Sequence, residues 1–323
     1  MRLRRPLTRS RNCASIFMSL NLFNQRKFQF MGLALSATLS LFAQSPDLAP
    51  AGGRPANALI SLKLEAATTG HVPLKVGGFS VVQARADLSL PLPPIGAGTY
   101  LIAGLNYQQH ALTLDSATPL PTQLQSLKAS LTLIRIINPA WTFIGSVSPG
   151  LHNAGTRFTS RGFGVGTLAV ANRKFSNDFS AGFGAVYNSL SREHGRALPV
   201  ASFEWQASPE WKIFVGFPRS GASWQMTDDL AVEFIAEADF GTYYVTTDPQ
   251  PSLAKKPALN RTRLDYQAFR LGAAAAWRFS PHTSLRATLG AVPMLKADYH
   301  QRNYELKSER AAPFFSLALE QKF

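Results

Sequence analysis

The sequence has one cysteine among its 323 residues, and charged residues make up only 16% of it. A single cysteine excludes a disulfide scaffold and a cysteine-rich metal site. No apolar run reaches the roughly 18 residues that a membrane-spanning helix needs, which excludes a multi-span helical membrane protein. Hydrophobic residues still account for 46% of the chain, so wholesale disorder is excluded as well.

The positive charge of the chain is unevenly placed. Residues 1–43 contain seven Lys and Arg and no acid, which leaves 26 basic and 19 acidic residues and a net charge of +7, rather than +14, for the rest. Arg26 and Lys27 precede an apolar run, Met31–Ala43, that polar residues follow. This order is typical of a secretory signal peptide. We therefore expect residues 1–43 to be a signal peptide with an extended leader; an amphipathic first helix is the alternative.

The remainder divides into a short linker and a long patterned region. Residues 44–58 are rich in Pro, Gly and Ala and predict a flexible tether or a plug. In residues 59–323, apolar and polar side chains alternate in many segments, as from Val82 to Leu90, where even positions are apolar and odd positions polar. Many of these segments reach ten residues. Globular strands average about five or six residues, whereas strands that cross a bilayer need about nine to eleven.

The connections between these segments are of two kinds. Five are tight turns rich in Pro, Asn, Asp and Ser, such as Asn138–Trp141 and Ser208–Trp211, and three of the five lead directly into an aromatic residue. Between them lie longer basic segments such as 248–263 and 299–310. Short turns on one rim, long loops on the other and an aromatic girdle are the layout of a bacterial transmembrane β-barrel.

We therefore predict an all-β fold, a closed antiparallel transmembrane β-barrel over residues 59–323, in the outer membrane of a Gram-negative bacterium. Fourteen strands are expected, with twelve as the alternative because 220–226 is the weakest segment and the number should be even. The expected spans are 59–68, 79–91, 99–114, 126–138, 141–149, 162–174, 179–191, 197–207, 211–218, 220–226, 230–246, 265–279, 284–297 and 311–323.

The C-terminal residues carry a further pattern. Phe315, Leu317, Leu319 and Phe323 share one face of the last predicted strand. This resembles the terminal strand that the barrel assembly machinery recognises in bacterial outer-membrane barrels. Gln321 departs from the usual apolar residue at its position. The resemblance implies that the assembly machinery is a partner of the chain.

One region resembles a known family. The matching segments are Leu198–Val200, Phe203–Trp205, Ser208–Trp211, Val215–Pro218 and Leu230–Tyr244. These segments are similar to an uncharacterised family of outer-membrane β-barrels, a domain of unknown function of the DUF6268 type. The resemblance implies a barrel in the outer membrane and implies no reaction.

Strict alternation of inward- and outward-facing side chains predicts which residues face the barrel interior. A shift of one residue in register would move every assigned side chain to the lipid face. The expected interior residues are Arg85, Asp87, Lys128, Glu204, Lys212, Glu233, Glu237, Asp239, Arg270, Arg278 and Arg286.

Two functions fit such an interior. Opposed charges across a constriction would select polar or charged solutes in a passive pore. The same charges could instead form salt bridges that fill a non-conducting structural or surface-binding barrel. We predict a pore or transport channel for small polar or amphipathic solutes, with the filled barrel as the alternative.

Other sites find little support. The six histidines fall mostly in expected loops without metal-ligand spacing, so we expect neither a metal nor a cofactor. No nucleophile motif accompanies the single close acid–histidine pair, Glu193–His194, and we do not expect an enzyme. The basic loops lack interleaved aromatic residues, which argues against nucleic acid and favours contact with membrane lipid and lipopolysaccharide.

Overall fold

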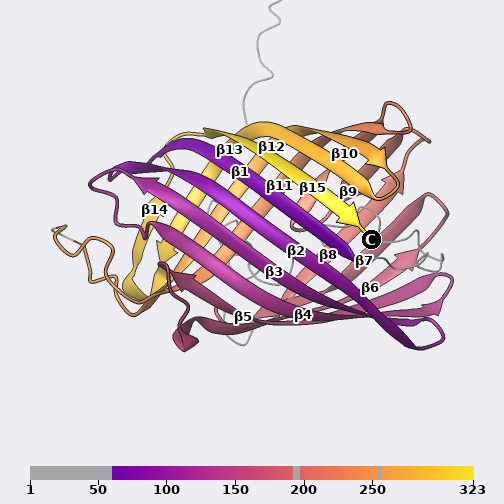
Figure 1. The fold of residues 1–323 in the computed structure, drawn as a ribbon, viewed down its shortest axis with the longest axis horizontal. Coiled ribbons are helices and arrows are strands. Elements are labelled where there is room, and N and C mark those ends of the chain that lie inside the picture. Colours follow the sequence, from indigo (N-terminus) through magenta and orange to yellow (C-terminus); the bar gives the residue numbers. More distant parts are fainter. Residues whose placement is uncertain (1–59, 192–196, 254–255) are drawn as a thin grey trace, which may run out of the picture. The chain divides into compact units, whose positions relative to one another are not determined.

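The computed structural model describes residues 60–191, 197–253 and 256–323. They form one antiparallel sheet in which strands adjacent in the chain pair with each other (Figure 1). The sheet closes because β12 pairs with β13, β13 with β15, and β15 with β1. The result is the predicted barrel of 14 strands, to which the short β14 adds a rim extension beside β13. The expected signal and tether lie outside the described residues.

The strand boundaries follow the period-two segments of the sequence closely. The weakest predicted segment, 220–226, is a barrel strand, and the prediction of fourteen strands is confirmed. The strands are β1 (Ser61–Pro73), β2 (Gly78–Gly96), β3 (Thr99–Leu114), β4 (Gln123–Asn138), β5 (Trp141–Ala154), β6 (Phe163–Lys174), β7 (Phe179–Asn188), β8 (Leu198–Gln206), β9 (Trp211–Val215), β10 (Arg219–Gln225), β11 (Leu230–Val245), β12 (Thr262–Ser280), β13 (Thr283–Tyr299), β14 (Tyr304–Lys307) and β15 (Ala312–Lys322). Two 3-10 turns, η2 (Ser160–Gly162) and η3 (His300–Arg302), lie in the loops.

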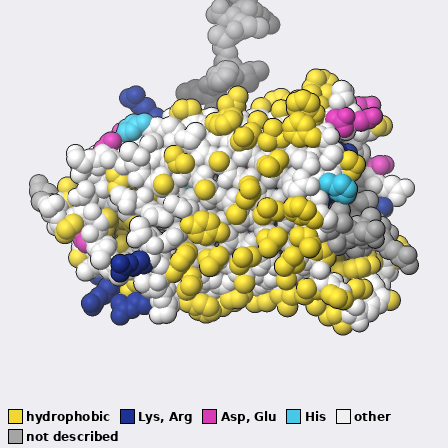
Figure 2. Space-filling view, in the orientation of Figure 1, with side chains coloured by type: hydrophobic (Ala, Val, Ile, Leu, Met, Phe, Trp, Pro, Cys, Tyr) yellow, Lys and Arg dark blue, Asp and Glu magenta, His cyan; other side chains and the backbone are white. Residues whose placement is uncertain are grey.

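The outer surface of the barrel is apolar. Val82, Phe234 and Leu271 are 58%, 57% and 46% exposed, while alternate neighbours such as Gln83 and Arg270 are buried. Figure 2 shows the apolar side chains spread over the middle and the short-turn end, with charged side chains mainly near the two ends. No helix in the described part of the chain is long and apolar enough to cross a membrane.

The two rims differ as the sequence predicts. At one rim, tight turns are fixed by their own polar side chains: Asn138 Oδ1 accepts the backbone N–H groups of both Ala140 and Trp141 at 2.9 Å. Aromatic side chains surround this short-turn rim, and Trp211 stacks on Trp224 with ring centroids 5.9 Å apart. The chain end after β15 lies at the same rim, whereas the longer loops and β14 lie at the opposite one (Figure 1).

The interior near the long-loop rim is filled by an apolar core. Loop residues Leu120 and Leu259 are 1% and 0% exposed, so both loops fold inward over the barrel. They pack with inward-facing strand residues that include Phe79, Tyr243 and Tyr299. We call this the rim core. Among the described residues, the rim core fills the interior at the long-loop end of the barrel.

β11 separates from β10 halfway along its length while staying paired with β12 throughout. It pairs with β10 only as far as Glu237, and further on Tyr244 pairs in parallel with Asn153 of β5. Five strands, β6–β10, separate β5 from β11 in barrel order, so this bridge crosses the interior at the long-loop rim. The bypassed strands are short, with 12, 10, 9, 5 and 7 residues.

The inward lean of β11 places its outer face against the inner faces of β6–β8. Side chains from both surfaces form a second apolar cluster, which we call the seam cluster. Three members are buried and four are half-buried. They are Leu168, Val170 and Val186, with Leu198, Val200, Phe217 and Phe240.

Candidate functional site

A buried ion pair spans the middle of the barrel interior. Arg270 on β12 donates to Asp239 on β11 at 3.0 Å, and the two side chains are 6% and 12% exposed. The same Arg270 nitrogen donates to Gln83 on β2, across the barrel. Asp239 also accepts a 3.3 Å hydrogen bond from Gln108 on β3. Side chains from four strands therefore meet in one bonded group that pairs the two charges, although the buried Nε of Arg270 has no hydrogen-bond partner among the described residues.

A glycine makes room for this arginine. The guanidinium carbon of Arg270 lies 5.6 Å from the centroid of the Phe314 ring. A Cβ atom added to Gly290 would lie 2.6 Å from that ring and 2.1 Å from the carbonyl oxygen of Leu271. Any larger residue at position 290 would displace the ring on which Arg270 stacks.

A second charged group lies beside the first, on β2 to β4. Arg85 Nε donates to Asp87 at 2.9 Å, and Asn106 Nδ2 donates to the other oxygen of the same carboxylate. Lys128, which is opposite Asn106 in the strand register, is only 5% exposed. Charged side chains on this side of the barrel are thus buried and bonded rather than open to solvent.

A third group lies nearer the short-turn rim. Arg219 on β10 and Arg286 on β13 both donate to one oxygen of Glu233 on β11. Their side chains are 10%, 22% and 9% exposed, respectively. Two guanidinium groups share this carboxylate, and Glu237 lies opposite Arg219 in the strand register.

The interior beside β8 is not filled by any of the residues that the structure describes. On its outer face Phe203 and Trp205 are 36% and 46% exposed, and on its inner face Ser202 and Glu204 are exposed too. A strand exposed on both faces has open space on its inner side. On the neighbouring strand β9, Lys212 forms a 3.1 Å ion pair with Glu204, with side chains 26% and 48% exposed.

One histidine corrects the sequence interpretation. His152 lies inside β5 rather than in an expected loop, whereas His110 lies in β3, within an expected strand, and both are buried. The His110 ring lies edge-on to Tyr266, with centroids 5.0 Å apart, and its Nε2 lies 2.9 Å from Gln108. These contacts make His110 part of the packing between the charged groups and the rim core. Within the described residues, no three His, Cys, Asp or Glu side chains are grouped to hold a metal.

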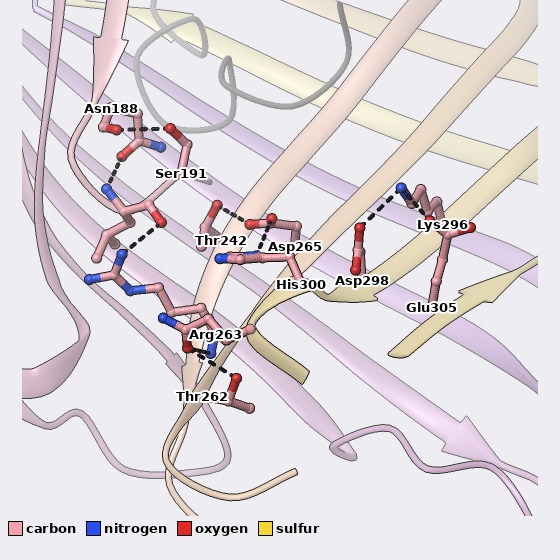
Figure 3. Close-up of polar contacts among 12 residues, drawn as sticks. Asn188, Ser191, Thr242, Thr262, Arg263, Asp265, Lys296, Asp298, His300 and Glu305 are labelled. Carbon is pink, nitrogen blue, oxygen red and sulfur yellow. Dashed lines mark hydrogen bonds and ion pairs between the residues drawn. The ribbon is translucent and has the colours of Figure 1, made fainter. Parts of the chain in front are cut away.

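Polar contacts fasten the loops over the long-loop rim (Figure 3). The carboxylate of Asp265 accepts from Thr242 at 2.7 Å and contacts His300 Nδ1 at 2.9 Å. Arg263 donates to the carbonyl oxygen of Leu190, in the loop after β7, at 3.3 Å. These bonds tie that loop and η3 to the ends of β11 and β12, so the upper end of the seam cluster is covered by polar groups.

Lys296 holds β13 and β14 together beside this network. Its Nζ lies 3.1 Å from Asp298 and 2.6 Å from Glu305 on β14 (Figure 3). The ion pair to Glu305 gives the short β14 an anchor in addition to its backbone pairing.

All eleven residues predicted for the interior lie in barrel strands, at differing depths. Their role in contacting a solute stays a prediction. Asp87, Lys128, Glu233 and Arg270 are buried; Arg85, Lys212, Glu237, Asp239 and Arg286 are half-buried; Glu204 and Arg278 are exposed.

The sequence interpretation missed Arg219, although Arg219 completes the group around Glu233. The predicted strand began one residue later, at position 220. Alternation along the strand could have identified it, because Arg219 shares the inner face with Gly221 and Ser223. These two residues lie opposite Ile235 and Glu233, respectively. Lys63 and Glu65 of β1, 3.9 Å apart, were also missed.

The last strand presents the expected face. Phe315, Leu317 and Leu319 are each 41% exposed on the outer surface, and Phe323 is 64% exposed after the strand ends. The backbone N–H of Phe323 donates to the carbonyl oxygen of Ile60 at 2.8 Å, next to the closing pair of β1 and β15. Recognition of these residues by the assembly machinery stays a prediction.

Comparison with protein families matches residues 97–319 to the domain of unknown function DUF6268, and the chain belongs to that family. Comparison with curated proteins finds no match.

Similar solved structures include an outer membrane channel from Pseudomonas putida F1, at 8% identity and a TM-score of 0.49, covering 86% of this chain and 100% of that one. A Pseudomonas aeruginosa FadL homologue is 12% identical, with a TM-score of 0.47, over 82% and 90% of the two chains. The P. putida toluene transporter TodX is 11% identical, with a TM-score of 0.43, over 82% and 89%. Likeness at this level concerns the fold alone.

Proposed function

We propose that this barrel resides in the bacterial outer membrane as a channel for small polar or amphipathic solutes. The observation that carries the proposal is the open inner face of β8, where Ser202 and Glu204 are exposed inside a barrel whose outer face is apolar. A barrel that served only as a scaffold would gain stability by filling that space with side chains.

The charges of the interior support the same proposal. Removing a charged side chain from water is costly unless it is paired, and a purely structural interior is more cheaply built from apolar residues. This barrel instead has charged groups at several depths, from the Glu204–Lys212 pair through Glu233 to Asp239 and Arg270. This series of charged groups offers a polar solute alternative hydrogen-bonding partners along the barrel interior.

A non-conducting barrel is the second candidate, and the rim core favours it. Leu120 and Leu259 are fully enclosed within apolar packing at the long-loop rim. For a channel, this core would have to rearrange or be bypassed on the side of the short strands. A structural or surface-binding barrel would need no such movement.

Single-channel recording in planar bilayers tests the proposal. We expect the folded barrel to give discrete conductance steps, and Glu204→Lys to shift its ion selectivity toward anions, because Glu204 lies exposed in the open part of the interior. The matched control is Glu210→Lys, which alters an exposed acid in a short turn outside the barrel wall. A folded barrel that shows no steps under any voltage would contradict the channel and favour the structural barrel.

A further inference from the structure

The barrel wall is interrupted above the hairpin of β9 and β10. Pairing between β8 and β9 ends at Phe203 opposite Val215, so residues 198–202 of β8 pair only with β7. On the other side, the last backbone hydrogen bond between the hairpin and β11 among the described residues runs from Ala238 N to Pro218 O, at 2.9 Å. Among the described residues, no strand lies between the edges of β8 and β11 beyond this point.

Aromatic and aliphatic side chains line this interruption. Phe217, at the tip of the hairpin, stacks on Phe240 of β11 with ring centroids 5.5 Å apart and planes 12° from parallel. Leu198 and Val200 of β8 pack against the same cluster and are half-buried. The interruption therefore presents an apolar surface between the open part of the interior and the outer face of the barrel.

A cation, Arg219, begins β10 two residues after Phe217. The Arg219 side chain is 10% exposed, and its guanidinium carbon lies 5.2 Å from the centroid of the Phe214 ring. One of its nitrogens donates to Glu233, but among the described residues its buried Nε has no hydrogen-bond partner. Arg286 binds the same carboxylate, and a second acid, Glu237, lies opposite Arg219 in the strand register.

We propose that this seam binds amphipathic anions, with the anionic group on Arg219 and the apolar chain against Phe217 and Phe240. The inference rests on the proposed function, since it names a solute class for the open part of the interior. The buried, unpaired Nε supplies a donor for an anion, and the neighbouring rings supply the apolar contact. Small neutral polar solutes would use only the Nε donor, and hydrocarbons would use only the aromatic rings.

Binding of octanoate to the barrel in lipid nanodiscs tests the proposal, measured by calorimetry against empty nanodiscs. We expect Arg219→Gln to weaken octanoate binding about tenfold or more, the usual effect of losing a charge-assisted hydrogen bond, and to leave octanol binding within about twofold. Phe240→Ala should weaken both ligands. Arg219→Lys, which keeps the charge but not the guanidinium, should recover part of the octanoate affinity.

Arg173→Gln is the matched control, because Arg173 also lies over aromatic rings, those of Trp141 and Phe175, but at the exposed short-turn rim. Equal weakening by Arg173→Gln, or unchanged octanoate binding in a folded Arg219→Gln barrel, would overturn the site. Heat-modifiable migration on gels establishes folding for each variant. A barrel that conducts but does not bind octanoate would refute this inference alone, and a silent barrel that binds octanoate would refute only the channel.

Discussion

The two sides of this barrel are built differently. The long side comprises β1–β5, β11–β13 and β15, nine strands of 11–19 residues whose inner faces meet in the rim core and in bonded charged groups. The short side comprises β6–β10, five strands of 5–12 residues, and the inner face of β8 is exposed.

This difference follows from the bridge between β5 and β11. The bridge closes the long side on itself near the long-loop rim, so that side chains on those strands face one another at packing distance. Strands of the short side are excluded from that packing, and above the hairpin they face only the outer surface of β11. The central pair of Arg270 and Asp239, on the long side, is accordingly more deeply buried than the pair of Lys212 and Glu204 on the short side.

The largest expected difference between the two sides comes from deleting one cation on each. Arg270→Ala leaves Asp239 buried without its ion-pair partner and should cost about 3–5 kcal/mol of unfolding free energy. Lys212→Ala removes a cation from a solvent-exposed pair with Glu204 and should cost about 0–1 kcal/mol. Urea unfolding of the refolded barrel in detergent micelles measures both. Similar losses from the two variants would break the comparison.

The lipid-facing surface should not distinguish the two sides. Phe234 on the long side and Ala169 on the short side are both exposed on the outer wall. Arginine near the middle of the bilayer costs about 2–4 kcal/mol, so Phe234→Arg and Ala169→Arg should impair folding into lipid vesicles to a similar extent. If Ala169→Arg folded into vesicles normally while Phe234→Arg did not, the short side would not be embedded in lipid as the long side is.

The loops that cover the bridge should depend on Asp265. Asp265→Ala removes the carboxylate that accepts from the buried Thr242 hydroxyl and contacts the His300 ring, at a cost of about 1–3 kcal/mol. Hydrogen exchange should rise first in the loop after β7, which Arg263 ties to the same region. The control is Asp115→Ala, whose contact with His71 is 3.8 Å long and exposed. If exchange rises equally in both variants, Asp265 has no special role in this closure.

The smallest effect concerns acid pH and the loop between β11 and β12. Slight burial raises the pKa of Asp248. Hydrogen bonds from Lys256 and from the backbone of Leu259 and Gln250 outweigh this effect and hold the pKa below the ordinary 3.8. Such a carboxyl stabilises the loop above its unfolded pKa and loses the effect as the pH falls through its folded pKa. Exchange in 246–253 and 256–261 should therefore rise as the pH falls below about 4. In Asp248→Asn, the loop should lose this pH dependence, and retention of it would contradict the assignment.

Period two in the sequence was sufficient to place the strands and their faces. Val82 and Phe234 face outward and Asp87 and Arg270 inward, as alternation requires. The contacts of Glu233 were not available from the same pattern, because Arg219 and Arg286 reach it from two different strands. Alternation says which way a side chain points, but the depth and partner of that side chain depend on strand register and tilt.

The amino-acid sequence by itself determined a closed barrel, because alternating segments long enough to cross a bilayer leave no other way to satisfy every backbone group in lipid. It also determined which rim has the tight turns, since Pro, Asn and Ser act on their own neighbours. Only the tertiary structure decided that β11 leans across to β5 and that one side of the interior is filled while the other stays open. That bridge pairs residues about ninety positions apart, Asn153 with Tyr244, and local side-chain preferences cannot encode a contact whose geometry depends on the lengths of the five strands between them.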